Sequence, residues 1–284
     1  MRNVPRPADE LPGMLLTTPC PATALGLADL RSWPLAGDVP PAPRLAIVGS
    51  RAAQRRVLAA IPAVVHAAAA RGYTIVSGGA RGVDRAVHAA ALQLRVPQLA
   101  VLPCSPDLLY PPEHADLFAE IAAAPGSGLL FALEPGVTPT RAVFASRNEV
   151  VLDVCTALLV AQAGPRSGSW GTGRLALRRG MRTAAFTGSS GGADLIAGGA
   201  RSLAFTDDPV ALAAIVETWL SGQVTRPAWP AELAWLHAAL IAAGPRGLGV
   251  DDLPDPRTAC AALLAAELRG LVVESLPGRY HATG

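Results

Sequence analysis

The sequence predicts an α/β protein built on a doubly wound parallel sheet, followed by a small helical unit that ends in a hairpin. Short apolar runs without polar alternation, such as Leu45–Val48, are typical of strands buried on both faces. Segments with helical character separate these runs, and several of the runs end in glycine or serine. This repeated β-α-β order favours right-handed crossovers and therefore a parallel sheet.

In the main part of the chain, predicted strands and helices alternate. Strands are expected at 45–48, 73–76, 98–102, 129–133, 157–161 and 183–186. Helices are expected at 53–70, 85–94, 113–124, 141–151, 174–179 and 209–220. The glycine- and serine-rich stretches 164–173 and 188–192 predict loops, and 195–204 predicts the last short elements of the sheet.

The length and the proline distribution predict two folded domains. At 284 residues with 51% hydrophobic residues, the chain can bury more than one average core. Proline-rich residues 1–43 are expected to form an N-terminal arm, 44–220 the main domain and 221–230 a polar linker. In residues 231–284, two longer helices with a short one between them, then a hairpin turning at Pro277-Gly278, form a winged-helix pattern.

The charge distribution excludes a generally polycationic protein. All 24 basic residues are arginine, yet the formal net charge is only +2. A nucleic-acid site must therefore be a local cluster of arginine side chains and backbone N–H groups.

The cysteines and the apolar runs indicate a soluble, cytoplasmic protein without a metal site. Cys20, Cys104, Cys155 and Cys260 are scattered and form no CxxC pair or metal-ligand spacing, which is typical of free thiols in a reducing compartment. The first residues lack the apolar region of a signal peptide, and no apolar run is long enough to span a membrane. We expect no metal, no cofactor and no membrane contact.

Three loops that follow predicted strands combine glycine, serine and arginine. They are Gly49–Arg51, Ser77–Gly82 and Arg166–Ser169. In an open parallel sheet, loops after the strands meet at one edge, where ligands bind. Glycine lets a ligand approach the backbone, while hydroxyl, N–H and guanidinium groups bind phosphate oxygens. The three loops together predict a site for a phosphorylated ligand.

No pattern for catalysis accompanies these loops. The chain has neither GxxxxGK[ST] nor the GxGxxG spacing after Val48, and no Ser/His/Asp set stands out. Asp84 and His88 share a helix face; we expect Asp84 to be an N-cap and His88 to be structural or to touch the ligand. The sequence therefore predicts a binding protein with no catalytic residue.

Six motifs carry a resemblance to a known family. LAIVGSR, YTIVSGGARGVDRAVHAAAL, VLP…LYPPEH, FASRN, RSGSWGTGRLALRRG and LIAGGA follow one another between Arg44 and Ala204. In this order they resemble the DprA/Smf DNA-processing family. The tail LLAAELRGLVVESLPGRYHATG resembles the winged-helix domain that often ends its members.

The resemblance implies an extended Rossmann-like fold that binds single-stranded DNA at the sheet edge. It also implies a homodimer that protects incoming DNA and loads a RecA-type recombinase in natural transformation. A duplex DNA contact through the winged helix, by Arg257, Arg269 or Arg279, is as plausible as a packing role for that domain. The positions that match DNA-contacting motifs are Gly49, Ser50, Arg51, Ser77, Gly78, Gly79, Arg81, Gly82, Arg147, Asn148, Arg166, Ser167, Gly168, Ser169 and Thr172.

The chain departs from the family pattern at three positions. Gly79 replaces a usual leucine, Glu149 a usual arginine and Gln162 a common glutamate. Loss of the positive charge at position 149 is expected to weaken DNA binding.

Two other functions remain open from the sequence. The same superfamily includes nucleotide phosphoribohydrolases with a PGGxGTxxE loop, but Leu175 stands where their glutamate would be. A sensor that binds a small phosphorylated ligand and signals through the winged helix is the other alternative. The few aromatic residues near the loops, Trp170 and Tyr110, predict that DNA binding is largely electrostatic.

Overall fold

The computed structural model divides into two compact units, residues 1–220 and 221–284. It describes residues 6–7, 17–25, 32–222, 231–243, 248–253, 255–268, 272–276 and 279–282. In the described part of the chain, no helix combines the length and the apolar character needed to cross a membrane.

The first unit contains a nine-stranded sheet with the order β11-β10-β9-β4-β5-β6-β8-β3-β2. The seven strands from β11 to β8 are parallel, and β3 and β2 continue the sheet in antiparallel pairing. Their bounds are β2 Thr18–Pro21, β3 Ser32–Gly37, β4 Arg44–Gly49, β5 Thr74–Ser77, β6 Gln98–Leu102, β8 Gly128–Phe131, β9 Ala157–Gln162, β10 Arg182–Phe186 and β11 Arg201–Leu203. The parallel, doubly wound sheet predicted from the sequence is confirmed.

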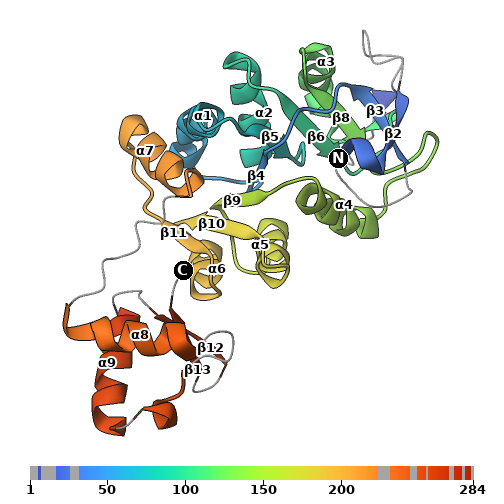
Figure 1. Ribbon diagram of the computed structural model, residues 1–284. Helices are drawn as coiled ribbons and strands as arrows, with labels where there is room; N and C mark the ends of the chain where they lie inside the picture. The colour runs from blue at the N-terminus through green and yellow to red at the C-terminus, as the bar shows by residue number, and fades with distance from the viewer. Residues whose placement is uncertain are drawn as a thin grey trace. The chain divides into compact units, whose positions relative to one another are not determined.

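Helices cover both faces of this sheet (Figure 1). One face carries α1 (Arg55–Ala70), α2 (Val83–Gln93), α3 (Ala115–Ala123) and α7 (Pro209–Leu220). The other carries α4 (Arg141–Asp153), α5 (Gly168–Arg178) and α6 (Ser190–Ala197). Central strands are apolar on both sides because they are buried between these two layers; Leu45 and Ile47 face one layer, while Ala46 and Val48 face the other.

Three short strands of the described residues lie within the stretch expected to be an N-terminal arm. β2 and β3 extend the sheet beyond β8, with Leu35 paired to Leu130. Prolines at positions 19, 21 and 34 hide the strand pattern in the sequence, but proline is tolerated near a sheet edge, where fewer N–H groups are needed. Much of the rest of 1–43 lies outside the described residues. A two-residue strand, β1 (Arg6–Pro7), pairs with β7 (Leu108–Leu109) in the segment expected to be a loop, and the 3₁₀ helix η3 (Pro112–His114) follows it.

Helices begin inside two stretches predicted to be loops. α5 starts at Gly168, not at 174, because the Ser167 hydroxyl accepts a bond from the N–H of Trp170 and caps the helix. Gly173 lies inside α5, and it allows α5 to pack closely on α6, because a Cβ on Gly173 would stand 2.7 Å from Leu195. α6 likewise starts at Ser190, capped by Ser189, so residues 190–192 are helical.

The second unit contains η4 (Ala231–Leu233), α8 (Ala234–Ala243), η6 (Val250–Asp252), α9 (Pro256–Leu268) and the antiparallel strands β12 (Val272–Leu276) and β13 (Arg279–Ala282). Its core is formed by Leu236, Leu240, Leu263 and Ala266, among others. The expected Pro277-Gly278 turn and residues 223–230 of the linker lie outside the described residues.

Candidate functional site

The three arginine-bearing loops meet at one edge of the sheet, as their order in the chain predicts. β4 lies between β9 and β5, and all three strands are parallel. The loops after β4, β5 and β9 are therefore neighbours. Val83 N donates to Ser50 O at 3.2 Å, and Ser50 N donates to Gln162 O at 2.8 Å, so the first loop is bonded to both of its neighbours.

Close packing of the first two loops requires glycine at two positions. A Cβ on Gly49 would stand 2.5 Å from the Val83 side chain, and one on Gly82, whose φ is +73°, would stand 2.3 Å from Ser50 O. Neither glycine could be replaced without moving the neighbouring loop.

Two hollows open at this edge. The large hollow, of about 610 Å³, is lined by Val48, Gly49, Ser50, Arg51, Ala52, Ala80, Asp84, Phe144, Arg147, Asn148, Ser167, Gly168, Ser169 and Thr172. The small hollow, of about 20 Å³, is lined by Arg51, Gly78, Ala80, Arg81, Pro103, Tyr110, Pro111, Phe144 and Arg147. Arg51, Ala80, Phe144 and Arg147 belong to both, so the two hollows adjoin.

Eleven of the fifteen residues proposed from the sequence line one of the hollows, and four do not. Ser77 is fully buried and its hydroxyl donates to Ile47 O at 2.7 Å. Gly79 packs against Leu102 and Phe118, where a leucine would need space that the core does not offer. Gly82 contacts the first loop, and Arg166 is exposed with a φ of 57°. These four residues shape or flank the loops without lining a hollow.

Arg147 is the buried cation of the site. Its side chain comes from α4, and the residue is only 5% exposed. Among the described residues, no carboxylate lies within ion-pair distance of Arg147, and its Nε has no hydrogen-bond partner. Burial lowers the pKa of Arg147, while the nearby Asp84 carboxylate opposes that shift. A guanidinium in this position is suited to binding an anion that enters either hollow.

Asp84 joins the first two loops instead of capping a helix. The N-cap position of α2 is Gly82, and Asp84 lies in the first turn, buried, with its Oδ2 accepting from Ala80 N at 3.3 Å. Burial raises the pKa of this carboxyl, and Arg147 together with the N–H groups of Ala80 and Gly49 opposes the increase. The N-cap prediction is therefore wrong: the carboxylate is a bridge between loops at the wall of the large hollow.

His88 has a structural position behind the second loop. Its Nδ1 is 2.7 Å from Gln98 Oε1, and the side chain is fully buried. Burial lowers the pKa of His88 to about 4, so the ring is neutral near pH 7. The residue lines neither hollow.

An aromatic residue that sequence reasoning missed stands between the hollows. The Phe144 ring lies 5.8 Å from the Arg51 guanidinium and makes an edge contact with Tyr110 at 5.5 Å. Phe144 and Arg147 are three residues apart on α4 and therefore share a helix face. The three-residue spacing of Phe144 and Arg147 within FASRN could have identified Phe144 as a site residue from the sequence.

Glu149 and Gln162, two departures from the family pattern, have local partners. Glu149 pairs with Arg179 at 3.2 Å and lines neither hollow. Gln162 Oε1 accepts from Gln54 N at 2.8 Å, where α1 begins without a cap from Gln54 itself.

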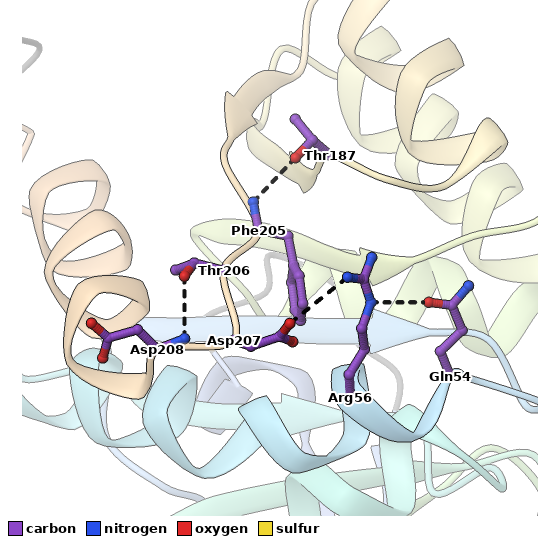
Figure 2. A network of polar contacts seen from close by, with 7 residues as sticks. All are labelled: Gln54, Arg56, Thr187, Phe205, Thr206, Asp207 and Asp208. Carbon is purple, nitrogen blue, oxygen red and sulfur yellow. Dashed lines mark hydrogen bonds and ion pairs between the residues drawn. The ribbon is translucent and has the colours of Figure 1, made fainter.

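The loops after β10 and β11 continue the same edge but form a separate polar network (Figure 2). Arg56 contacts the Phe205 ring at 5.1 Å, donates to Gln54 Oε1 at 3.2 Å and lies 3.9 Å from Asp207. Arg56 shares its charge with Asp207, so it is less available to an anion than an arginine without a carboxylate partner. The candidate anion site is therefore limited to the loops after β9, β4 and β5.

Comparison with known proteins agrees with this fold. The family model described as DNA recombination-mediator protein A matches residues 35–213. Protein Smf of Synechocystis is 40% identical over 106 residues, covering 37% of this chain and 26% of that protein. DNA processing protein DprA of Streptococcus pneumoniae is 34% identical over 149 residues, covering 52% of this chain and 51% of that protein. The chain thus spans about a quarter to a half of these curated relatives.

A solved structure of a DNA processing protein A has a similar fold. DNA processing protein A from Helicobacter pylori, described for its single-stranded DNA binding mode, superposes with a TM-score of 0.61. The two are 26% identical, and the match covers 72% of this chain and 96% of the other. Since the family model spans well over half of the sequence, this chain belongs to the DprA/Smf family of DNA recombination-mediator proteins.

Proposed function

We propose that this protein binds single-stranded DNA along the sheet edge, with backbone phosphates at Arg51 and Arg147. The observation that carries the proposal is the large hollow, whose wall combines a buried arginine without an ion-pair partner in the described chain and glycine- and serine-rich loops. A volume of about 610 Å³ exceeds what a lone phosphate fills and suits a nucleotide unit. The Helicobacter pylori relative supports the choice of single-stranded DNA.

Phe144 adds a stacking surface to this proposal. Its ring lines both hollows beside Arg51 and Arg147, so a base next to a bound phosphate can reach its face. Stacking on an aromatic ring contributes to single-strand affinity without selecting a sequence. The protein should therefore bind through more than phosphate contacts alone.

The experiment is an anisotropy titration with single-stranded and duplex oligonucleotides at two salt concentrations. Arg51→Ala should lower single-strand affinity and flatten the salt dependence by about 0.7 in log–log slope, the loss of one phosphate contact. Arg71→Ala is the matched control, because exposed Arg71 follows α1 at the opposite edge of the sheet. Unchanged affinity in Arg51→Ala would place the DNA elsewhere.

We also propose a non-enzymatic role. Among the described residues, Asp84 is the one carboxylate that lines the large hollow, and it accepts hydrogen bonds from backbone N–H groups. Leu175 stands where the phosphoribohydrolases have glutamate. Incubation with nucleoside monophosphates should release no free base. Release of base would favour the phosphoribohydrolase reading.

The family supports a wider role in DNA recombination. We propose that the protein is a cytoplasmic homodimer that protects incoming DNA and delivers it to a RecA-type recombinase, with residues 231–284 as a winged-helix domain after a linker at 221–230. The order of elements in the second unit supports this domain. The side chains of Arg257, Arg269 and Arg279, expected to contact duplex DNA, lie outside the described residues. RecA filament assembly on coated single strands, with and without this protein, tests the role.

A further inference from the structure

Arg81 is already paired with a carboxylate in the structure, whereas neither Arg51 nor Arg147 pairs with a carboxylate of the described residues. Its Nε contacts the Glu113 carboxylate, and the two side chains are 46% and 42% exposed. Arg81 lines the small hollow, at the rim of the site. The guanidinium that the sequence assigned to a DNA phosphate is thus occupied by an anion from the protein itself.

The segment that carries Glu113 is fastened to the same loop. Glu113 lies in η3, and the next residue, His114, places its Nδ1 3.0 Å from Gly79 O. Tyr110 and Pro111, just before η3, line the small hollow beside Arg81. The contact between His114 and Gly79 therefore keeps the backbone of Glu113 close to Arg81. The Arg81 guanidinium keeps the pKa of Glu113 below its ordinary value, so the carboxylate is ionised at neutral pH.

We propose that Glu113 is an internal competitor of the DNA backbone for Arg81. The inference rests on the single-strand binding proposed above. While Glu113 neutralises Arg81, that arginine adds little to phosphate binding, and a phosphate gains the guanidinium only by displacing the carboxylate. Binding at the second loop becomes an exchange of one ion pair for another, whereas Arg51 and Arg147 bind without such an exchange.

Substitution of Glu113 tests the exchange directly. Glu113→Gln should tighten single-strand binding about two- to fivefold at low salt, the range expected for an exposed ion pair. It should also steepen the log–log salt dependence by about 0.7, because Arg81 then releases a counterion of its own. Glu120→Gln is the matched control, since it removes the same charge from an exposed position on α3. An affinity that is unchanged or weaker in Glu113→Gln, or equally raised in Glu120→Gln, overturns the proposal.

A double-mutant cycle separates competition from a general charge effect. Arg81→Ala should cost less than about twofold in the wild-type background but should cancel the whole gain of Glu113→Gln. Equal costs in both backgrounds would show that Glu113 does not compete with DNA for Arg81. Normal wild-type binding with an unresponsive Glu113→Gln defeats only this inference. A wild-type protein that does not bind single strands defeats the proposed function and this inference together.

Discussion

The guanidinium of Arg147 lies against the backbone of Gly78, where a side chain would have to be. A Cβ built on Gly78 would stand 1.6 Å from Arg147 Nη1 and 2.8 Å from Asp84 Oδ2. The glycine is therefore required by the buried arginine and not by a left-handed backbone. The second loop and α4, about seventy positions apart in the sequence, come together through this contact in the proposed anion site.

The Gly78→Ala substitution should displace Arg147 and weaken single-strand binding about tenfold or more, the loss expected for a charge-assisted contact. The measurement is an anisotropy titration at low salt. Gly164→Ala is the matched control, because a Cβ there would meet no atom within 4 Å. Full affinity in Gly78→Ala would mean that Arg147 does not need its present position for binding.

The buried His88 should make the unfolding free energy of the protein decrease in acid. Its folded pKa is about 4, whereas an unfolded histidine titrates near 6.5. Between these values the unfolded chain binds more protons, so stability is present above pH 6.5 and is lost as pH falls toward 4. From pH 7 to pH 5 the group should remove about 2 kcal/mol of unfolding free energy.

Unfolding in guanidinium chloride at pH 7 and at pH 5 measures this loss of stability. The difference should shrink by that amount in His88→Gln, whatever the absolute stability of the variant. His66→Gln, an exposed position on α1, should keep the wild-type difference. A His88→Gln protein that loses as much stability between pH 7 and pH 5 as the wild type would contradict the assignment.

Glu149→Arg, which restores the family residue, should change single-strand affinity by less than about threefold at physiological salt. The Glu149 side chain pairs with Arg179 and lines neither hollow. An exposed charge outside the hollows is largely screened from a bound strand at physiological salt. This expectation differs from the sequence alone, which suggests that the lost positive charge weakens binding. Anisotropy titrations of the two proteins distinguish the views, since a gain of tenfold would place side chain 149 beside the DNA.

Gln162→Ala should lower the unfolding free energy by about 1 kcal/mol, the usual cost of losing a cap at a helix N-terminus. The amide oxygen of Gln162 supplies the acceptor for Gln54 N that Gln54 itself lacks. Gln162→Glu keeps an acceptor there and should retain the wild-type stability. Chemical denaturation of both variants checks the contrast, and equal losses would show that the hydrogen bond is not the cause.

Several features of the molecule were determined by the sequence. Buried strands, helices and their alternation follow from local apolar patterns, and right-handed crossovers then leave little freedom in where the loops after β4, β5 and β9 lie. Arg51, Ser167 and Ser169 could therefore be assigned to one sheet edge before any coordinates were known. Arg147 came from the family resemblance instead, and its neighbour Phe144 was overlooked although both lie on one helix face.

The tertiary structure alone decided which charges at that edge have partners. Arg81 and Glu113 are 32 positions apart in the sequence. The paired strands β3 and β8 are also far apart along the chain, and no local sequence pattern predicts either pairing. Local patterns report the conformation of a segment, because propensity and amphipathicity act over a few residues. Ion pairs, loop-to-loop bridges such as Asp84 and the space beside Gly78 depend on side chains that meet only after the sheet has formed. For that reason the sequence predicted where the proposed anion site lies, and the fold determined that Arg147 has no ion-pair partner there among the described residues while Arg81 is paired with Glu113.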